Sequence, residues 1–353
     1  MIRSLSLILG FITMSVHGYQ CQTQKNTINP PDDLSQSTYY PAGWTENQPI
    51  PTVENGQNCV ITVKIPRGYY ANVTFYRDFP YSTGSYALIV NNDTQPFFFM
   101  FPKFVVNLQT VNSTEYTTRF AFKIQWKIIP DIGRDTIIIE KKNPPVASFP
   151  GANFITFSGN QGSQLALMAF SLTDPANNYL LRQTAIFDGD SSDSNFIGTL
   201  DQVLTSKTPL IASRNKISVY TFDLGNYFYC PLFMAQDKDD IKGYQVYLGR
   251  NCEDNGECTV TLDGSLGNSL TVTESDGPEI IKRFNFFPPT ATINVYENTV
   301  SSVTKVAEFN STNFYEQLPF QVNGNMKFYE LVGTGMYDMV VTREVSRAAR
   351  LQL

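Results

Sequence analysis

An apolar–polar alternation that occurs three times along the chain is the feature that most constrains its fold. It is found in CVITVKIPRGYYANVTF (residues 59–75), NFITFSGNQGSQLALMA (153–169) and CTVTLDGSLGNSLTVTE (258–274). Because successive side chains of a strand point to opposite faces of its sheet, this period predicts strands. Each stretch has a glycine nine positions after its first residue, so each predicts a strand, a glycine turn and a second strand.

The same alternation assigns the faces of the predicted strands. The apolar side contains Ile61, Val63, Ala71 and Val73 in the first stretch, Ile155, Phe157, Leu165 and Leu167 in the second, and Val260, Leu262, Leu270 and Val272 in the third. The first and third stretches are one-sided, whereas Met168 places an apolar residue on the polar side of the second. We expect the apolar sides to face a core and Asn72 to point outward.

A second landmark repeats with the strands. Pro96, Pro209 and Pro319 each precede an apolar residue, and each is followed by a lysine seven or eight positions later. Two landmarks that recur at about 100–110 residues indicate three related β units, although any β-rich sequence yields some chance matches of this kind. The proline-rich stretch EKKNPPVASFPG is typical of a domain boundary. The predicted organisation is a signal peptide over 1–18 and three units over 19–143, 144–250 and 251–353.

Composition assigns the fold class. The chain has 26 Phe and 19 Tyr but only 16% charged residues, and aromatic side chains are enriched in strands. No window maintains helical spacing over three turns. We therefore predict an all-β fold of tandem antiparallel β-sandwich units.

The N-terminal stretch MIRSLSLILGFITMSVHG reads as a secretory signal, with one positive charge at Arg3, an apolar run and small residues before Tyr19. The alternative, a retained signal anchor, is disfavoured because the apolar run is too short to span a bilayer. No later segment is long and apolar enough to be a transmembrane helix, and the basic C-terminal end does not fit a lipid anchor. The sequence predicts a secreted, extracellular protein.

Cleavage of this signal would remove His17, the only histidine of the chain. Without an imidazole, a Ser-His-Asp relay and the His-containing zinc sites of extracellular metalloenzymes are excluded. Carboxylate chemistry remains, as in glycoside hydrolysis. Removing Arg3 from 26 basic residues leaves 25 against 32 acidic ones, a net charge of about −7, which disfavours nucleic acid as a partner.

Cysteines and sequons agree with an extracellular location. Five cysteines remain in the mature chain, and this odd number permits at most two intramolecular disulfides. Four sequons predict N-glycosylation at Asn72, Asn92, Asn112 and Asn310.

The N-terminal unit resembles a known family. The segments YYPAGWTENQPIP (39–51), Cys59 with ITVKIPRGYYANVTF, and TQPFFFMFP together are similar to the CUB-like domains of many secreted nematode proteins, most clearly over residues 21–130. The resemblance implies a jelly-roll β-sandwich, no enzymatic activity and a role in extracellular innate defence.

The resemblance also bears on metals and disulfides. The calcium-binding carboxylates of other CUB modules have no equivalent in the first unit. DGDSSD (188–193) has alternating carboxylates like a calcium loop but lacks the glycine and glutamate of an EF-hand loop, so a solvated loop is favoured over the alternative of a calcium site. DKDD (237–240) reads as a turn, and we predict no metal and no cofactor. The family implies a Cys21–Cys59 disulfide. Cys258 would pair with Cys230 by analogy, or with Cys252 across the Asn-Gly turn of EDNGE, and the sequence leaves both open.

Three functions are compatible with these observations. The favoured one is a non-enzymatic binding or defence protein, whose partner is an extracellular protein or glycan. The second is a carbohydrate-binding protein that stacks sugar on Tyr39, Tyr40 and Trp44. The third, a carboxylate-based glycosidase, is the least supported because no pair of acids stands out.

Overall fold

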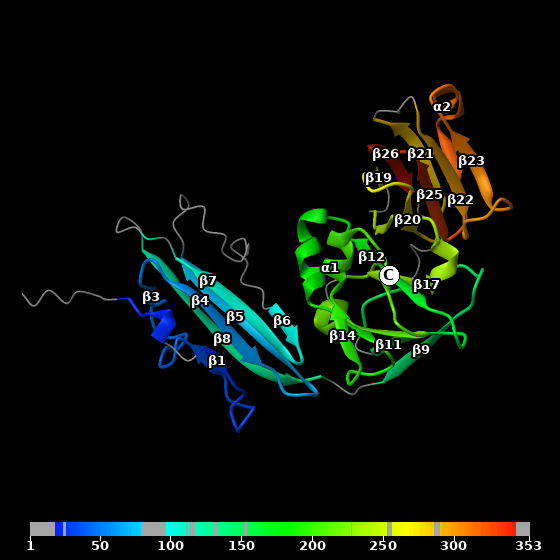
Figure 1. Cartoon of the computed structure of the whole chain (residues 1–353). Helices are drawn as coiled ribbons and strands as arrows, with labels where there is room; N and C mark the ends of the chain where they lie inside the picture. The colour runs from blue at the N-terminus through cyan, green and yellow to red at the C-terminus, as the bar shows by residue number, and fades with distance from the viewer. Residues whose placement is uncertain are drawn as a thin grey trace, which may run out of the picture. The chain divides into compact units, whose positions relative to one another are not determined.

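The computed structural model describes residues 18–23, 26–78, 97–110, 112, 117–129, 133–151, 154–226, 228–252, 256–285 and 290–343. Almost all of the predicted signal peptide, and Asn92 and Pro96, lie outside these residues. The chain forms two compact units, Met1–Ile128 and Ile129–Leu353, both of them built mainly from strands (Figure 1). No helix in the described part of the chain has the length and apolar character needed to cross a membrane.

The first unit is a sandwich of two sheets. The three-stranded sheet has the order β1 (Thr27–Ile28), β4 (Asn58–Lys64) and β7 (Lys103–Gln109). The five-stranded sheet has the order β2 (Thr38–Tyr40), β8 (Thr118–Ile128), β5 (Tyr69–Asp78) and β6 (Phe97–Met100), and β3 (Thr52–Val53) also pairs with β8. A short 3₁₀ helix, η1 (Cys21–Thr23), precedes these strands.

The core of this sandwich confirms the alternation of the first stretch. On β4, Ile61 and Val63 are fully buried, whereas Thr62 between them is only half-buried on the other face. Ala71 of β5 and Phe122 of β8 complete the core from the opposite sheet. β4 and β5 belong to different sheets, so the turn at Gly68 carries the chain from one layer of the sandwich to the other.

The described residues of the second unit form three sheets. The longest has the order β10 (Val146–Ser148), β17 (Phe233–Asp237), β12 (Leu165–Ser171), β18 (Val246–Arg250), β20 (Ser269–Glu274), β25 (Met326–Val332), β22 (Thr292–Glu297) and β23 (Lys305–Phe309), with β15 (Leu210–Ile211) paired to β12. A five-stranded sheet has the order β14 (Asn195–Gly198), β13 (Ala185–Asp188), β16 (Lys216–Tyr220), β11 (Phe154–Gly159) and β9 (Arg134–Ile139). A four-stranded sheet has the order β19 (Glu257–Asp263), β26 (Met336–Arg343), β21 (Glu279–Phe284) and β24 (Phe320–Val322).

Helices of the second unit are short. They are η2 (Pro175–Arg182), α1 (Leu200–Ser206), η3 (Phe222–Asn226), η4 (Lys238–Ile241) and α2 (Phe314–Gln317). α1 begins at a capping box, in which the Thr199 hydroxyl accepts from the Gln202 amide and the Gln202 side chain accepts from the Thr199 amide. Its residues Leu200 and Val203 pack into the core next to β12.

The nine-stranded sheet is shared by two sandwiches. One face of β12 packs toward β11 of the five-stranded sheet through Leu165 and Leu167. At the other end of the same sheet, β25 and β22 pack toward the four-stranded sheet through Leu331 and Ile293. The second and third predicted sandwiches are therefore continuous with each other, because β18 pairs with both β12 and β20.

This continuity differs from the predicted organisation at both boundaries. β9 lies within the predicted first unit, 19–143, but pairs with β11, so the structural division falls after Ile128. The boundary predicted at 250/251 directly follows β18, which is paired inside the nine-stranded sheet. The all-β sandwich fold is confirmed, and most strand pairs are antiparallel as predicted; β1–β4, β9–β11, β12–β18 and β18–β20 are parallel pairs.

The three glycine turns nevertheless occupy equivalent places. Gly68, Gly162 and Gly267 all have positive φ angles, of 80°, 86° and 128°, where glycine avoids the strain that a side chain would meet. Like the turn at Gly68, those at Gly162 and Gly267 join strands of different sheets, β11 to β12 and β19 to β20. Each repeated stretch is thus an arch between the two layers of a sandwich.

Candidate functional site

The three aromatic residues predicted to stack on sugar lie on β2 and the loop after it, and two of them are buried. Tyr40 is 3% exposed and stacks on Phe122 at 4.9 Å between ring centroids. Trp44 is 5% exposed, and its indole N–H donates to the Pro49 carbonyl at 3.1 Å. At this low exposure neither ring offers a broad surface to a ligand, so the structure does not support a stacking role for Tyr40 and Trp44. Both rings pack the sandwich.

Tyr39 is half-buried and lines a surface pocket of about 400 Å³ on the first unit. The pocket is formed by residues 27–32, residues 38–40 and Ala42. Two of its lining side chains are held by tryptophans. Trp44 packs edge-to-face on Tyr39 at 6.0 Å between ring centroids, and the indole N–H of Trp126 donates to the Thr38 hydroxyl at 3.0 Å. We refer to it as the Tyr39 pocket.

The lining of the Tyr39 pocket combines an aromatic ring with polar groups. Asn29, Asp32 and Thr38 supply amide, carboxylate and hydroxyl groups, and Pro30 and Pro31 give a rigid apolar rim. An aromatic ring takes up the apolar face of a ligand while a few polar groups fix its orientation. This chemistry suits a small ligand that has both apolar and hydroxyl-bearing faces.

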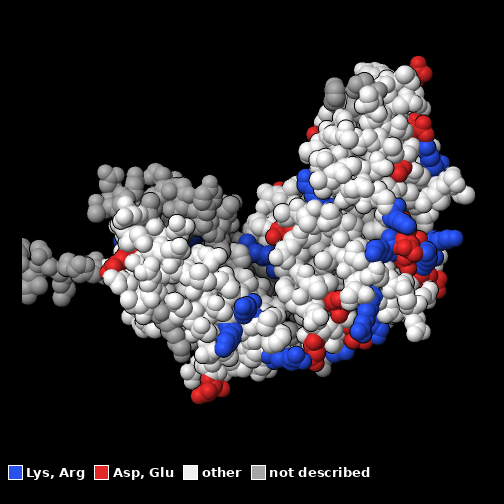
Figure 2. Space-filling model, in the orientation of Figure 1, with Lys and Arg blue, Asp and Glu red and all other residues white. Residues whose placement is uncertain are grey.

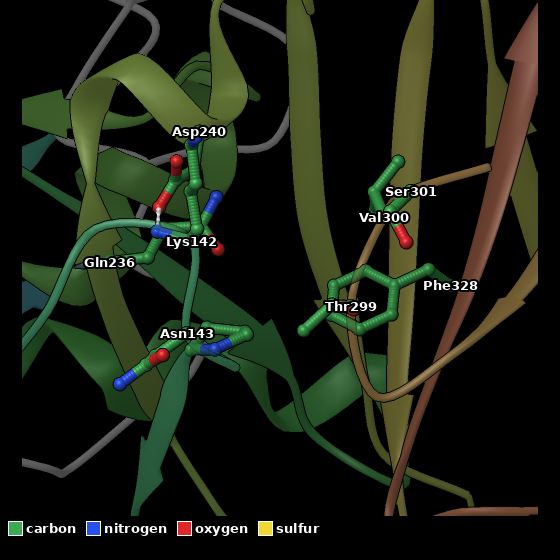
Figure 3. Close-up of a pocket in the computed structure, with 9 residues that line it drawn as sticks. Lys142, Asn143, Gln236, Asp240, Thr299, Val300, Ser301 and Phe328 are labelled. Atoms are coloured by element: carbon green, nitrogen blue, oxygen red, sulfur yellow. Dashed lines mark hydrogen bonds between the residues drawn. The ribbon is translucent and has the colours of Figure 1, made fainter. Parts of the chain in front are cut away.

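A second pocket, of about 350 Å³, lies within the second unit (Figure 3). Lys142, Asn143, Gln236 and Asp240 form one wall, and Thr299, Val300, Ser301 and Phe328 lie across from them. We refer to it as the Gln236 pocket. Sequence analysis missed it, because its residues come from distant parts of the chain that only the shared sheet brings together.

Charge in the Gln236 pocket is mixed. The backbone N–H of Lys142 donates to an Asp240 carboxylate oxygen at 2.7 Å. Burial raises the pKa of Asp240, and the neighbouring Asp237 and Asp239 carboxylates act in the same direction. Asp239 is paired with the Lys141 ammonium at 2.5 Å. The acidic run 237–240 lies at the start of the short helix η4. Asp237 is the N-cap residue, and its carboxylate accepts from the Asp239 amide at 2.9 Å.

The other acidic run, DGDSSD, is held by ordinary loop contacts. The Asp190 carboxylate pairs with the Lys216 ammonium at 2.7 Å, and the Asp188 carboxylate accepts from the Ser213 amide at 2.9 Å. Within the described ranges there is no group of three or more His, Cys, Asp or Glu side chains that could hold a metal ion. On the face shown in Figure 2, acidic and basic side chains are interspersed, so that face has no patch of a single sign.

The cysteines form two disulfides. Cys21 is bonded to Cys59, and Cys252 is bonded to Cys258. The alternative pairing of Cys258 with Cys230 is therefore wrong, and Cys230 is a half-buried free thiol. Burial raises the pKa of this thiol, which keeps it protonated and poorly nucleophilic.

Three of the four sequon asparagines are described. Asn112 is exposed. Asn310 begins a turn after β23, where the Thr312 amide and hydroxyl donate to its side-chain oxygen at 3.0 and 2.6 Å. Asn72 lies on the outward face of β5 and is half-buried beside its register partners Phe98 and Gln125.

These surroundings predict different glycan occupancy. We expect Asn112 and Asn310 to be fully occupied in the secreted protein, because Asn112 is exposed and Asn310 begins a turn. Asn72 should be partly occupied, because its side chain lies on a sheet and is half-buried. Asn112→Gln and Asn310→Gln should each remove one glycan mass, measured by intact-mass spectrometry before and after enzymatic deglycosylation. Equal occupancy at all three sites would contradict this prediction.

Two segments of the chain match known family models. Residues 16–130 match the family model of the CUB-like domain, and residues 138–222 match a domain of unknown function, DUF7592. No curated protein matches the chain.

Two solved structures resemble the chain only weakly. Lac15 from a marine microbial metagenome is 9% identical, with 82% of this chain and 83% of that chain covered and a TM-score of 0.14. A multicopper oxidase from Campylobacter jejuni, a metallo-oxidase, is also 9% identical, with 93% and 88% covered and a TM-score of 0.13. Similarity at this level supports no inference about fold or function.

Proposed function

We propose that the protein is a secreted, N-glycosylated extracellular binding protein without catalytic activity, and that it acts in innate defence. The observation that carries this proposal is an open, partly aromatic pocket on a disulfide-bonded CUB-like domain. The two disulfides support an oxidising, extracellular location. The defence role rests on the resemblance to secreted CUB-like proteins.

Affinity capture tests the proposal at its broadest. The secreted protein, used as bait on material from infected and uninfected hosts, should retain a microbial or host-surface ligand reproducibly. An empty capture from both sources would argue against a binding role. Hydrolysis of any member of a broad polysaccharide panel by the purified protein would contradict the absence of catalysis and favour the glycosidase alternative.

Carbohydrate is the second candidate, as the ligand of the Tyr39 pocket. Tyr39 and Tyr40 of the predicted aromatic trio both line this pocket, and of these two only Tyr39 is not buried. Asn29, Asp32 and Thr38 can exchange hydrogen bonds with sugar hydroxyls. A pocket of about 400 Å³ accommodates one or two sugar units rather than a long chain.

Tyr39→Ala is expected to weaken glycan binding at least tenfold, since removing a stacked aromatic ring costs about 1.5–3 kcal/mol of contact and area. Binding is measured on a glycan array and then by titration of the best ligand. Tyr315→Ala is the matched control, because Tyr315 is 83% exposed on the second unit. Equal affinity of Tyr39→Ala and Tyr315→Ala would exclude the Tyr39 pocket as the glycan site.

A further inference from the structure

The Gln236 pocket contains a largely buried amide side chain that uses one of its four hydrogen-bonding sites within the described chain. Gln236 lies on β17 and is 6% exposed. Its amide oxygen accepts from the Tyr247 hydroxyl at 3.4 Å, and among the described residues its amide nitrogen has no partner. This nitrogen is not one of the sealed, unpartnered polar atoms of the described residues, so it is open to the pocket and can donate to a ligand acceptor there.

An open acceptor and an apolar surface accompany this donor. One Asp240 carboxylate oxygen accepts from the Lys142 backbone, and the other oxygen has no partner within the described chain. Val300 is half-buried and is the accessible apolar part of the lining, which also includes the buried Pro145 and Phe328. Figure 3 shows Gln236 and Asp240 on one wall and Phe328 and Val300 across from them.

The lining contains both a cationic and an anionic side chain, and this limits the net charge of a ligand. Lys142 would repel a cation, and Asp240, with the neighbouring Asp237 and Asp239, would repel an anion. A neutral ligand avoids both costs. The rim residues Asn143, Thr299 and Ser301 add neutral polar groups that match hydroxyls.

We propose that the Gln236 pocket binds the acetamido group of an N-acetylated sugar. The group presents a carbonyl oxygen to the Gln236 amide N–H, an N–H to the open Asp240 oxygen, and a methyl to Val300. The sugar hydroxyls face the rim. Because the Gln236 pocket lies in the second unit, this site does not depend on the Tyr39 pocket proposed above.

The test is titration calorimetry on the full secreted chain with N-acetylglucosamine, glucose and an N-acetylated amino-acid amide. We expect a dissociation constant on the order of 1 mM for N-acetylglucosamine, as is usual for a weak small ligand. Glucose, which lacks the acetamido group, should bind at least tenfold more weakly, and so should the amide without a sugar. Equal binding of glucose would overturn the acetamido assignment, and equal binding of the amino-acid amide would overturn the sugar assignment.

Substitutions in the lining test whether N-acetylglucosamine binds in the Gln236 pocket. Gln236→Glu replaces the donor by an acceptor of nearly the same shape and should weaken binding of N-acetylglucosamine at least tenfold. If that variant melts at a lower temperature than the parent, Ser301→Trp serves instead, because Ser301 is exposed at the rim and the indole would fill the mouth of the pocket. Tyr315→Ala, on the same unit but outside the lining of the pocket, should leave this affinity unchanged. Loss of binding in Tyr39→Ala but not in Gln236→Glu or Ser301→Trp would overturn the proposal, as would no binding by the parent protein.

Discussion

Glu279→Leu is expected to destabilise the second unit by about 3–5 kcal/mol, because it leaves a buried cation without its partner. Glu279 is fully buried, and one of its carboxylate oxygens accepts from the Arg343 guanidinium at 2.8 Å. The other oxygen accepts from the hydroxyls of Thr273 and Tyr329 at 2.7 and 2.8 Å. Arg343 is 9% exposed, and within the described chain one of its terminal nitrogens already has no partner.

Urea unfolding measures this loss, with far-UV circular dichroism as the probe for the whole chain. The matched control is Glu257→Leu, which breaks an ion pair with Arg283 on the same four-stranded sheet, at 2.9 Å but half-exposed. An exposed pair contributes at most about 1 kcal/mol, so this control should change little. Comparable losses in the two variants would show that burial does not determine the effect.

Both tryptophans of the chain, Trp44 and Trp126, are buried in the first unit. Tryptophan fluorescence therefore reports unfolding of the first unit alone. Its midpoint should not move in Glu279→Leu, which makes the first unit an internal reference. A shifted fluorescence midpoint would mean that the two units unfold together, and the single-unit free energy would no longer be defined.

Alternation predicted the first unit well because its strands bury one face each. Ile61 and Val63 of β4 point into the core and Val60 is 53% exposed, so the two faces meet different environments and the period is visible in the sequence. The glycine turn was also readable, since Gly68 has a φ of 80°. What the period cannot specify is the partner strand, and β4 pairs with β7 and β1 rather than with β5, the next strand in the chain.

Alternation was less informative in the second unit, where the shared sheet is covered on both faces. Met168 was the exception in the second stretch, and it is fully buried because β12 packs Leu165 and Leu167 on one side and Met168 and Phe170 on the other. A strand buried on both faces loses its period. In the third stretch the predicted apolar row is divided between two cores: Val260 and Leu262 of β19 pack in the core beneath the four-stranded sheet, whereas Leu270 and Val272 of β20 pack with Met168 and Phe170. Thr273, on the other face of β20, bonds to Glu279.

The candidate sugar-binding residues were predicted from their aromatic residue type, and residue type does not determine whether a side chain is exposed. Tyr39, Tyr40 and Trp44 are all aromatic, but a strand directs Tyr39 and Tyr40 to opposite faces, and only Tyr39 reaches a pocket wall without being buried. Gln236 carried no sequence signal at all. Its role depends on Asp240 and Phe328, and β25, which carries Phe328, is far from η4 in the chain.

The double variant Cys21→Ala/Cys59→Ala is expected to destabilise the first unit by about 4 kcal/mol. The disulfide closes a loop of sequence separation 38, and its removal returns that much chain entropy to the unfolded state in the loop-closure model. Both cysteines belong to the buried core, and alanine avoids a new buried polar group. The loss is measured as the shift of the tryptophan fluorescence transition in urea, without reductant.

The second disulfide supplies the control. Cys252 and Cys258 are separated by 6 positions, so the same model gives about 2 kcal/mol for Cys252→Ala/Cys258→Ala. That loss should appear in circular dichroism, which includes the second unit, and not in tryptophan fluorescence. Because the short loop restrains few conformations of the unfolded chain, the two disulfides should differ about twofold. A larger effect from the second pair would mean that strain or packing, and not loop entropy, governs how these disulfides stabilise the protein.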